Sequence, residues 1–208
     1  MDVGPSVVRR LLEQGFTINE IDIIVLTHFH VDHTADLSTF LFASNYSVDP
    51  RTRPLTIIAG QGIHRFYRSL LNVYRWLKPK HYELTIRSSI KGELQLYDII
   101  IQTVKMNHNR ESVGVSIEKK KRVVFSGDTD YSKNLIKLAH KADLLVAECS
   151  FPETKLKGHM NLEVLDRVVK EARPERVILS HLYPEWDAFK GVLHGPYLLA
   201  EDGMEIIL

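Results

Sequence analysis

A stretch of histidine and aspartate directly after an apolar segment constrains this chain more than any other feature. The stretch T-H-F-H-V-D-H places His28, His30, Asp32 and His33 within six positions. It follows a continuous β-branched run that predicts a strand over 21–27, covered on both faces. Imidazole and carboxylate groups are metal ligands, and chance produces this spacing in roughly one of a thousand such chains. A buried strand ending at a metal site is therefore predicted, with a coincidental polar loop as the alternative.

The spacing within the stretch suggests that one short segment serves two metal ions. Side chains alternate with a period of two in an extended loop, so His28 and His30 are expected to point the same way. Asp32 continues the alternation, and a turn at His33 can direct its imidazole toward a second ion.

Composition indicates an ordinary globular protein. The 208 residues suit one domain over 1–208, and 44% hydrophobic residues provide material for a core. The formal net charge of +1 gives no overall basic excess that would favour nucleic acid. The basic run at 119–122 lies between two strand-like segments, so we interpret it as a hairpin tip, with a phosphate-binding patch as the alternative.

The single cysteine and the absence of long apolar runs bear on location. Cys149 has no partner for an intrachain disulfide, which favours a reducing compartment. The N-terminus lacks the apolar core of a signal peptide, and no apolar run approaches the roughly 18 residues of a membrane span. We therefore expect a cytoplasmic protein with no membrane partner.

Hydrophobic periodicity predicts a layered α/β protein with mixed sheets. Strands over 82–126 should be largely antiparallel, and helices and strands alternate elsewhere. Helices are predicted at 5–15, 36–46, 62–77, 134–141 and 161–172. Further strands are predicted at 55–59, 144–147, 176–180 and, after the Asp-Gly turn at 202–203, at 204–208.

Three more candidate ligands follow apolar strands elsewhere in the chain. His108 comes after I-I-I-Q-T-V-K-M-N, Asp128 after V-V-F-S-G, and His181 after V-I-L-S. An isolated histidine is usually structural, but strand ends in α/β folds are where functional sites assemble. Because all three share that position, we interpret them as ligands.

These motifs, taken in order, resemble those of the metallo-β-lactamase superfamily. H-F-H-V-D-H, the lone His108, S-G-D-T and S-H-L carry the resemblance from about Ile21 onward. V-A-E-C-S-F and G-H-M-N make the chain similar to the ribonuclease Z-like branch. The resemblance implies a four-layered αββα sandwich with mixed sheets and a dinuclear metal site. Met1–Pro5 resembles only the tail of the segment with which that fold opens, so we expect its N-terminal strands to be missing.

The resemblance also implies a role for each candidate residue. His28, His30 and His108 would hold one ion, Asp32, His33 and His181 the other, and Asp128 would bridge both. Two divalent ions are expected, zinc first, with manganese or iron as alternatives because no cysteine is among the ligands. Asp32 would orient or deprotonate the attacking water. His159 would act as the general acid, oriented by Glu148, or would be a structural residue beside the Asn161 helix cap.

The leading functional hypothesis is a metal-dependent phosphodiesterase that uses a metal-bound hydroxide on a small-molecule or nucleotide ester. Ribonuclease Z-type tRNA 3′-processing is an alternative, although the resemblance implies a tRNA-gripping arm between His108 and Asp128, which are only 20 positions apart. Nucleic acid is therefore a partner that the sequence does not favour. Hydrolysis of another ester, thioester or lactone and a non-catalytic metal-binding relic are further alternatives. An exposed sheet edge would allow a homo-oligomer.

Overall fold

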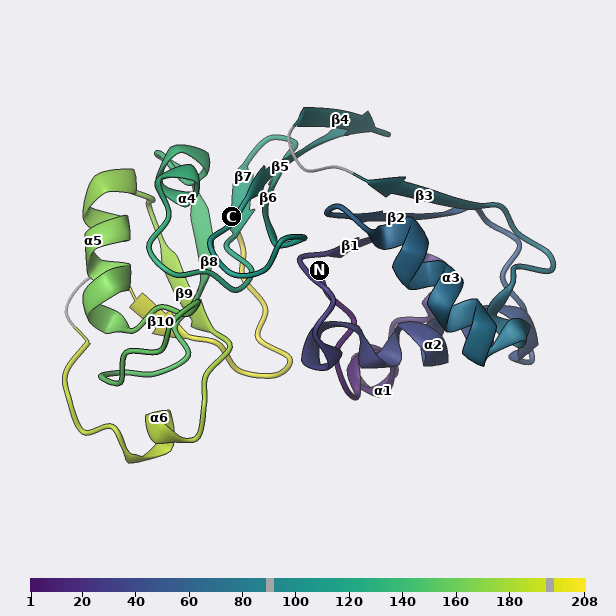
Figure 1. Cartoon of the computed structure of the whole chain (residues 1–208), viewed down its shortest axis with the longest axis horizontal. Helices are drawn as coiled ribbons and strands as arrows, with labels where there is room; N and C mark the ends of the chain where they lie inside the picture. Colours follow the sequence, from purple (N-terminus) through teal and green to yellow (C-terminus); the bar gives the residue numbers. More distant parts are fainter. Residues whose placement is uncertain (89–91, 194–196) are drawn as a thin grey trace. The chain divides into compact units, whose positions relative to one another are not determined.

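The computed structural model describes residues 1–88, 92–193 and 197–208 (Figure 1). They fall into two units, Met1–Ser89 (unit 1) and Ile90–Leu208 (unit 2), each considered by itself. The single domain over 1–208 stays a prediction.

A parallel sheet forms the centre of unit 1. Its strands, in spatial order, are β1 (Ile23–Leu26), β2 (Leu55–Ala59) and β3 (Leu84–Ser88). The apolar runs behave as predicted, with Leu26 and Ala59 fully buried. The antiparallel character predicted from residue 82 onward is wrong for β3, which pairs in parallel with β2. A helix lies between β2 and β3 in the sequence and brings the chain back to the end of the sheet at which β2 began. The two strands can therefore run in the same direction.

Helices cover this sheet, and the helix after the histidine stretch begins earlier than predicted. They are α1 (Val7–Glu13), η1 (Ile18–Glu20), α2 (Val31–Tyr46), α3 (Ile63–Val73) and η2 (Arg75–Leu77). His30 is the extended N-cap of α2, so Asp32 and His33 lie in its first turn and not in an extended loop. A carboxylate there is favoured by the helix dipole. The helix predicted to run to 77 ends at Val73, because Tyr74 has non-helical dihedral angles.

Unit 2 contains a mixed sheet. In spatial order its strands are β10 (Tyr197–Leu199), β9 (Val177–Ser180), β8 (Leu144–Glu148), β7 (Arg122–Phe125), β6 (Val113–Glu118), β5 (Ile99–Lys105) and β4 (Gly92–Leu96). Pairing from β4 to β7 is antiparallel, as predicted, and from β7 to β10 it is parallel. The strand predicted at 204–208 is wrong: the turn at Asp202–Gly203 forms, but β10 already occupies the edge of β9.

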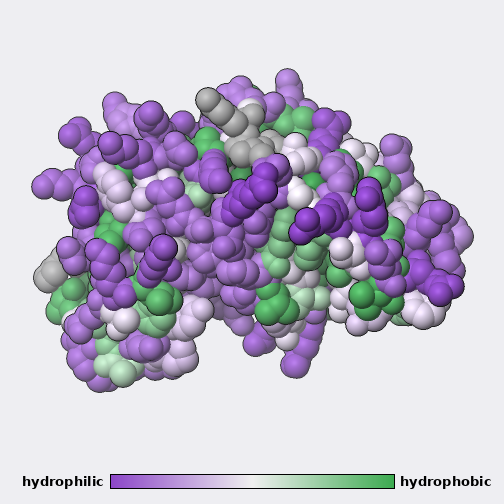
Figure 2. Space-filling view, in the orientation of Figure 1, coloured by the Kyte–Doolittle hydropathy of each residue, from purple (hydrophilic) through white to green (hydrophobic). Residues whose placement is uncertain are grey.

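Two capped helices and one short helix accompany this sheet: α4 (Lys133–Leu138), α5 (Leu162–Ala172) and α6 (Glu185–Ala188). The Asn161 side chain accepts a hydrogen bond from the Val164 N–H and begins α5 as predicted. Leu165 and Val168 of α5 are fully buried in the core. Hydrophilic side chains predominate over the part of unit 2 that carries α4 and α5 (Figure 2), consistent with an amphipathic α5.

The basic run forms the predicted hairpin tip between β6 and β7. The Lys119 N–H donates to the Lys121 carbonyl, which closes the turn. Lys119 pairs with Asp98, and Lys121 pairs with Asp143 at 2.6 Å. These ion pairs support the structural interpretation of the run. Among the residues that the structure describes, no helix combines the length and apolar character needed to cross a membrane.

Candidate metal centre

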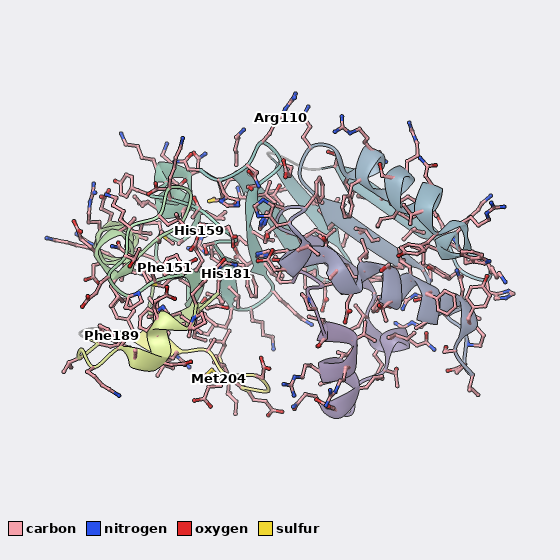
Figure 3. All side chains as sticks on the ribbon, turned by 60° about the horizontal axis from the view of Figure 1, so that its bottom comes forward. Arg110, Phe151, His159, His181, Phe189 and Met204 are labelled. Carbon is pink, nitrogen blue, oxygen red and sulfur yellow. The ribbon has the colours of Figure 1, made fainter. Side chains whose placement is uncertain are left out.

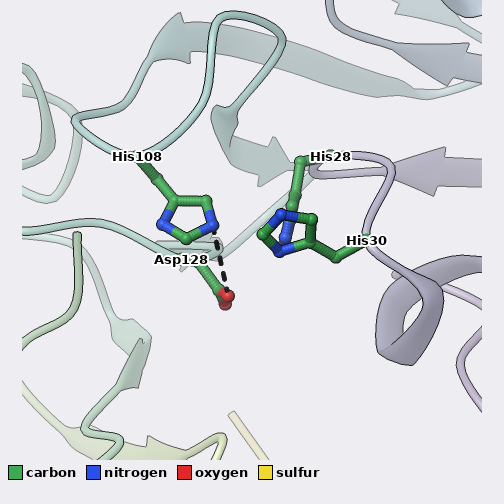
Figure 4. Close-up of side chains that lie close together, drawn as sticks. All are labelled: His28, His30, His108 and Asp128. Atoms are coloured by element: carbon green, nitrogen blue, oxygen red, sulfur yellow. Dashed lines mark ion pairs between the residues drawn. The ribbon is translucent and has the colours of Figure 1, made fainter. Parts of the chain in front are cut away.

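The histidine stretch forms a compact cluster at the end of β1. His28 is fully buried. The centres of the His28 and His30 rings lie 4.6 Å apart (Figure 4). The His28 and His33 ring centres lie 4.1 Å apart. We call His28, His30, Asp32 and His33 the unit 1 cluster. β1 and the first turn of α2 position all of its members.

Asp2 holds this cluster in place, although sequence reasoning did not assign it a role. Its carboxylate accepts hydrogen bonds from the Thr27 N–H at 2.7 Å and the Thr27 hydroxyl at 2.9 Å. The His33 Nδ1 lies 2.8 Å from the same carboxylate. Gly4 is required here because a Cβ would lie 2.0 Å from the Asp32 carbonyl oxygen. The available signal was the M-D-V-G opening, which resembles the tail of a family strand.

Asp32 occupies a different setting from its histidine neighbours. Its side chain is 49% exposed, whereas that of His33 is 9% exposed, and Asp32 Oδ2 lies 3.5 Å from His33 Nε2. Consecutive helical residues point about 100° apart, which follows from 3.6 residues per turn. The helix therefore turns His33 toward Asp2 and leaves the Asp32 carboxylate accessible to solvent.

A second cluster in unit 2 gathers around Asp128, which is 2% exposed. The Asp128 Oδ2 lies 3.9 Å from His108 Nε2 (Figure 4) and 3.6 Å from His181 Nε2. Asp128, His159 and His181 each offer a ligand atom within 4.8 Å of the others. The predicted strand-end residues do come together within unit 2, because β5, β7 and β9 share one sheet.

Glu148 and Ser150 connect the histidines of this cluster. The Glu148 carboxylate accepts from the Thr129 N–H at 2.6 Å and from the Ser150 hydroxyl at 2.8 Å. It also lies 3.2 Å from His159 Nδ1. The Ser150 oxygen lies 3.1 Å from His159 Nδ1 and 3.0 Å from His181 Nδ1. The His159 and His181 rings are stacked, with their centres 5.6 Å apart. Glu148 thus contacts His159 as expected, whereas Ser150 was missed because no local pattern marks it.

Gly158 orients His108 through its backbone. The His108 Nδ1 donates to the Gly158 carbonyl at 3.0 Å. Gly158 has φ of +88°, and a Cβ there would lie 2.9 Å from that same nitrogen. Glycine is needed both for the left-handed conformation and for the close approach of the ring. We call His108, Asp128, Glu148, Ser150, His159 and His181 the unit 2 cluster.

The donor atoms of both clusters suit a divalent cation. A metal-binding histidine almost always binds a carboxylate, carbonyl or similar group through its other ring nitrogen. Here the Nδ1 atoms of His33, His108 and His181 lie against Asp2, Gly158 and Ser150 respectively, so each would bind metal through Nε2. The lone thiol is not part of either cluster: Cys149 is fully buried, and burial raises its pKa to about 12. Nitrogen and oxygen ligands accommodate zinc, manganese and iron.

Comparison with known proteins gives the family. Residues 1–182 match the family described as "Beta-lactamase superfamily domain". The chain is 22% identical to a ribonuclease Z of Brevibacillus brevis, over 96% of this chain and 80% of the relative. It is 28% identical to the probable metallo-hydrolase YhfI of Bacillus subtilis, over 88% of this chain and 74% of the relative.

Solved structures agree with this match. The crystal structure of Bacillus subtilis YhfI superposes with a TM-score of 0.80 at 26% identity, covering 98% of this chain and 84% of that one. The short form of human tRNase Z gives 0.79 at 19% identity, with coverage of 98% and 85%. A diphosphatase from the PhnP family gives 0.71 at 17% identity, with coverage of 100% and 78%. The predicted α/β metallo-β-lactamase fold is confirmed, and the chain belongs to the beta-lactamase superfamily.

Proposed function

We propose that this metallo-β-lactamase-fold hydrolase cleaves phosphodiesters at a dinuclear metal centre. His28, His30 and His108 would hold one ion, and Asp32, His33 and His181 the other, with Asp128 shared. The observation that carries the proposal is a set of histidines that are each held in place by a contact at Nδ1. Two of them, His108 and His181, direct Nε2 toward the buried Asp128 carboxylate. Zinc is the first metal we propose, and the cytoplasm is the proposed location.

Two divalent cations, when bound, would supply the electrophilic part of the reaction, because such cations acidify water and stabilise negative charge on phosphate oxygens. Asp32 is suited to orient the attacking water and accept its proton, since its carboxylate is half exposed beside His33. Asp2 would keep the His33 ring in position through the hydrogen bond at Nδ1.

His159 is placed to protonate the leaving oxygen. Glu148 and Ser150 both contact its Nδ1, so the proton would be delivered from Nε2. A positioned general acid contributes about 10²–10⁴ in rate. The Glu148 carboxylate, which is 3% exposed, would stabilise the protonated ring before transfer.

The relatives support a phosphate ester as substrate, because their names describe ribonuclease Z proteins and a diphosphatase. Processing of tRNA stays the second candidate, because the chain is similar to a ribonuclease Z. That match extends over 259 positions, more than the 208 residues of this chain, so the relative has additional residues within the matched region. Between His108 and Asp128 the present chain contains only the β6–β7 hairpin. We therefore favour a small phosphodiester over tRNA.

Metal analysis and a chromogenic diester test the proposal. Purified protein should contain close to two transition-metal ions per chain, as expected for a dinuclear site, and should hydrolyse bis(p-nitrophenyl) phosphate. Asp128→Asn should lower both metal content and activity, whereas His140→Gln, at an exposed position, should change neither. Folded protein that gains no activity with zinc, manganese or iron would exclude the proposal. Thioester, lactone and sulfate ester substrates in the same assay distinguish the other hydrolase reactions.

A further inference from the structure

A cavity of about 780 Å³ lies in unit 2 directly beside His108. Three cationic residues, Lys105, Arg110 and Lys157, line it together with His108 and Asn107. Lys105, Arg110 and Lys157 are all exposed, and Arg110 lies at the periphery of the molecule in Figure 3. Since the whole chain has a net charge of only +1, this concentration of positive charge is local.

The walls of the cavity are held by hydrogen bonds between the end of β5 with the residues after it and the segment that leads from β7 into α4. The Asn107 side chain donates to the Tyr131 carbonyl at 2.7 Å, and the Asn107 N–H donates to the Thr129 hydroxyl at 3.0 Å. The Asn134 side chain donates to the Lys105 carbonyl at 2.9 Å. These bonds tie the segment after β5 to the segment after β7, so the cationic residues are carried by an ordered surface.

Among the described residues that line this cavity, Asp130 is the only acidic one. Its Oδ1 accepts a hydrogen bond from the Tyr131 N–H at 2.7 Å. The Tyr131 hydroxyl donates to Glu171 at 2.9 Å, and the Arg167 guanidinium lies 4.5 Å from the centre of its ring. The balance of charge in the cavity favours an anionic occupant.

We propose that this cavity binds a second phosphate of the substrate, so that the enzyme selects phosphodiesters of the nucleotide type with a phosphate beyond the bond that is cleaved. The inference rests on the proposed function, because His108 both lines the cavity and faces Asp128 at 3.9 Å. Lysine and arginine are the residues that bind phosphate through charge-assisted hydrogen bonds. The volume is within the range of small-molecule sites, about 300–1,000 Å³.

Two chromogenic substrates with the same scissile bond test this assignment on the metal-loaded protein. They are the p-nitrophenyl ester of thymidine 5′-phosphate and the same ester with a phosphate on the 3′-hydroxyl. The wild type should show a KM about tenfold lower for the 3′-phosphorylated ester, the size expected for one charge-assisted contact. The variant K105Q/R110Q/K157Q should lose that preference and keep its kinetics on the unphosphorylated ester.

A matched control separates the cavity from overall charge. The variant K119Q/K120Q/K121Q removes the same charge at the β6–β7 hairpin tip, outside the cavity, and should retain the preference. Equal KM values in the wild type, or equal loss of preference in both variants, would overturn the assignment.

Binding separates failure of the cavity from failure of the proposed function. If neither ester is hydrolysed, the phosphodiesterase proposal fails, and calorimetric titration of the same proteins with thymidine 3′,5′-bisphosphate decides about the cavity. Binding about tenfold weaker in K105Q/R110Q/K157Q alone supports it. Binding that is absent, or unchanged in this variant, overturns it.

Discussion

Replacing Glu148 by glutamine tests how the buried carboxylate acts on His159. Glutamine has the same shape but exchanges one acceptor oxygen for an amide that only donates. The remaining oxygen can still accept from the Thr129 N–H, at 2.6 Å, and the Ser150 hydroxyl can rotate to accept from the new amide. The Met160 N–H donates to Glu148 Oε2 at 3.3 Å in the wild type. In the variant it would face the new amide N–H group and would lose its acceptor.

The cost follows from those contacts. One buried N–H without an acceptor costs about 2 kcal/mol. For a chain of 208 residues that corresponds to a melting temperature lower by about 4–8 °C. The His159 ring would also lose its carboxylate partner at 3.2 Å. Activity on a diester with an alkyl leaving group should therefore fall by about 10²-fold, the lower part of the range for general-acid catalysis.

The leaving group identifies the step that is affected. A p-nitrophenolate leaves without protonation, so Glu148→Gln should lower kcat much less on bis(p-nitrophenyl) phosphate than on an alkyl ester. His159→Gln should show the same selectivity, and the double variant should be no slower than His159→Gln alone, because the two residues act as one unit. An equal loss on both substrates, or additive losses in the double variant, would refute a role through His159.

Three further predictions concern the supports of the two clusters. Asp2→Asn should weaken metal binding by roughly 10–100-fold, because it removes the anionic partner of His33 Nδ1; competition with a chelator measures this, and unchanged affinity would contradict it. Gly158→Ala should lower both metal affinity and thermal stability, since a Cβ there would lie 2.9 Å from His108 Nδ1. Gly15→Ala is the control and should lower stability only, because Gly15 also has a positive φ, of +82°, but a Cβ there would have nothing within 4 Å. Cys149 should resist a thiol reagent at pH 8 in the folded protein and react after denaturation, because a pKa raised to about 12 keeps it protonated far above that pH; rapid labelling of the native protein would be inconsistent with the burial.

Local features were predictable from sequence. The continuous apolar run gave β1, and Asn161 capped α5, because both depend on residues that are neighbours along the chain. The ligand types of the unit 1 cluster could be read directly from H-x-H-x-D-H. The family followed from the order of short motifs, which the match over residues 1–182 confirms.

The tertiary structure decided what depends on distant residues. Asp2 contacts His33 across 31 positions, and Ser150 contacts His181 across 31 positions, so no local pattern could pair them. The parallel pairing of β3 and the placement of β10 beside β9 depend on how helices and loops return the chain. Sequence thus determined which side chains could bind a metal, whereas folding determined which groups anchor those side chains, because hydrogen-bond partners are selected by proximity in space.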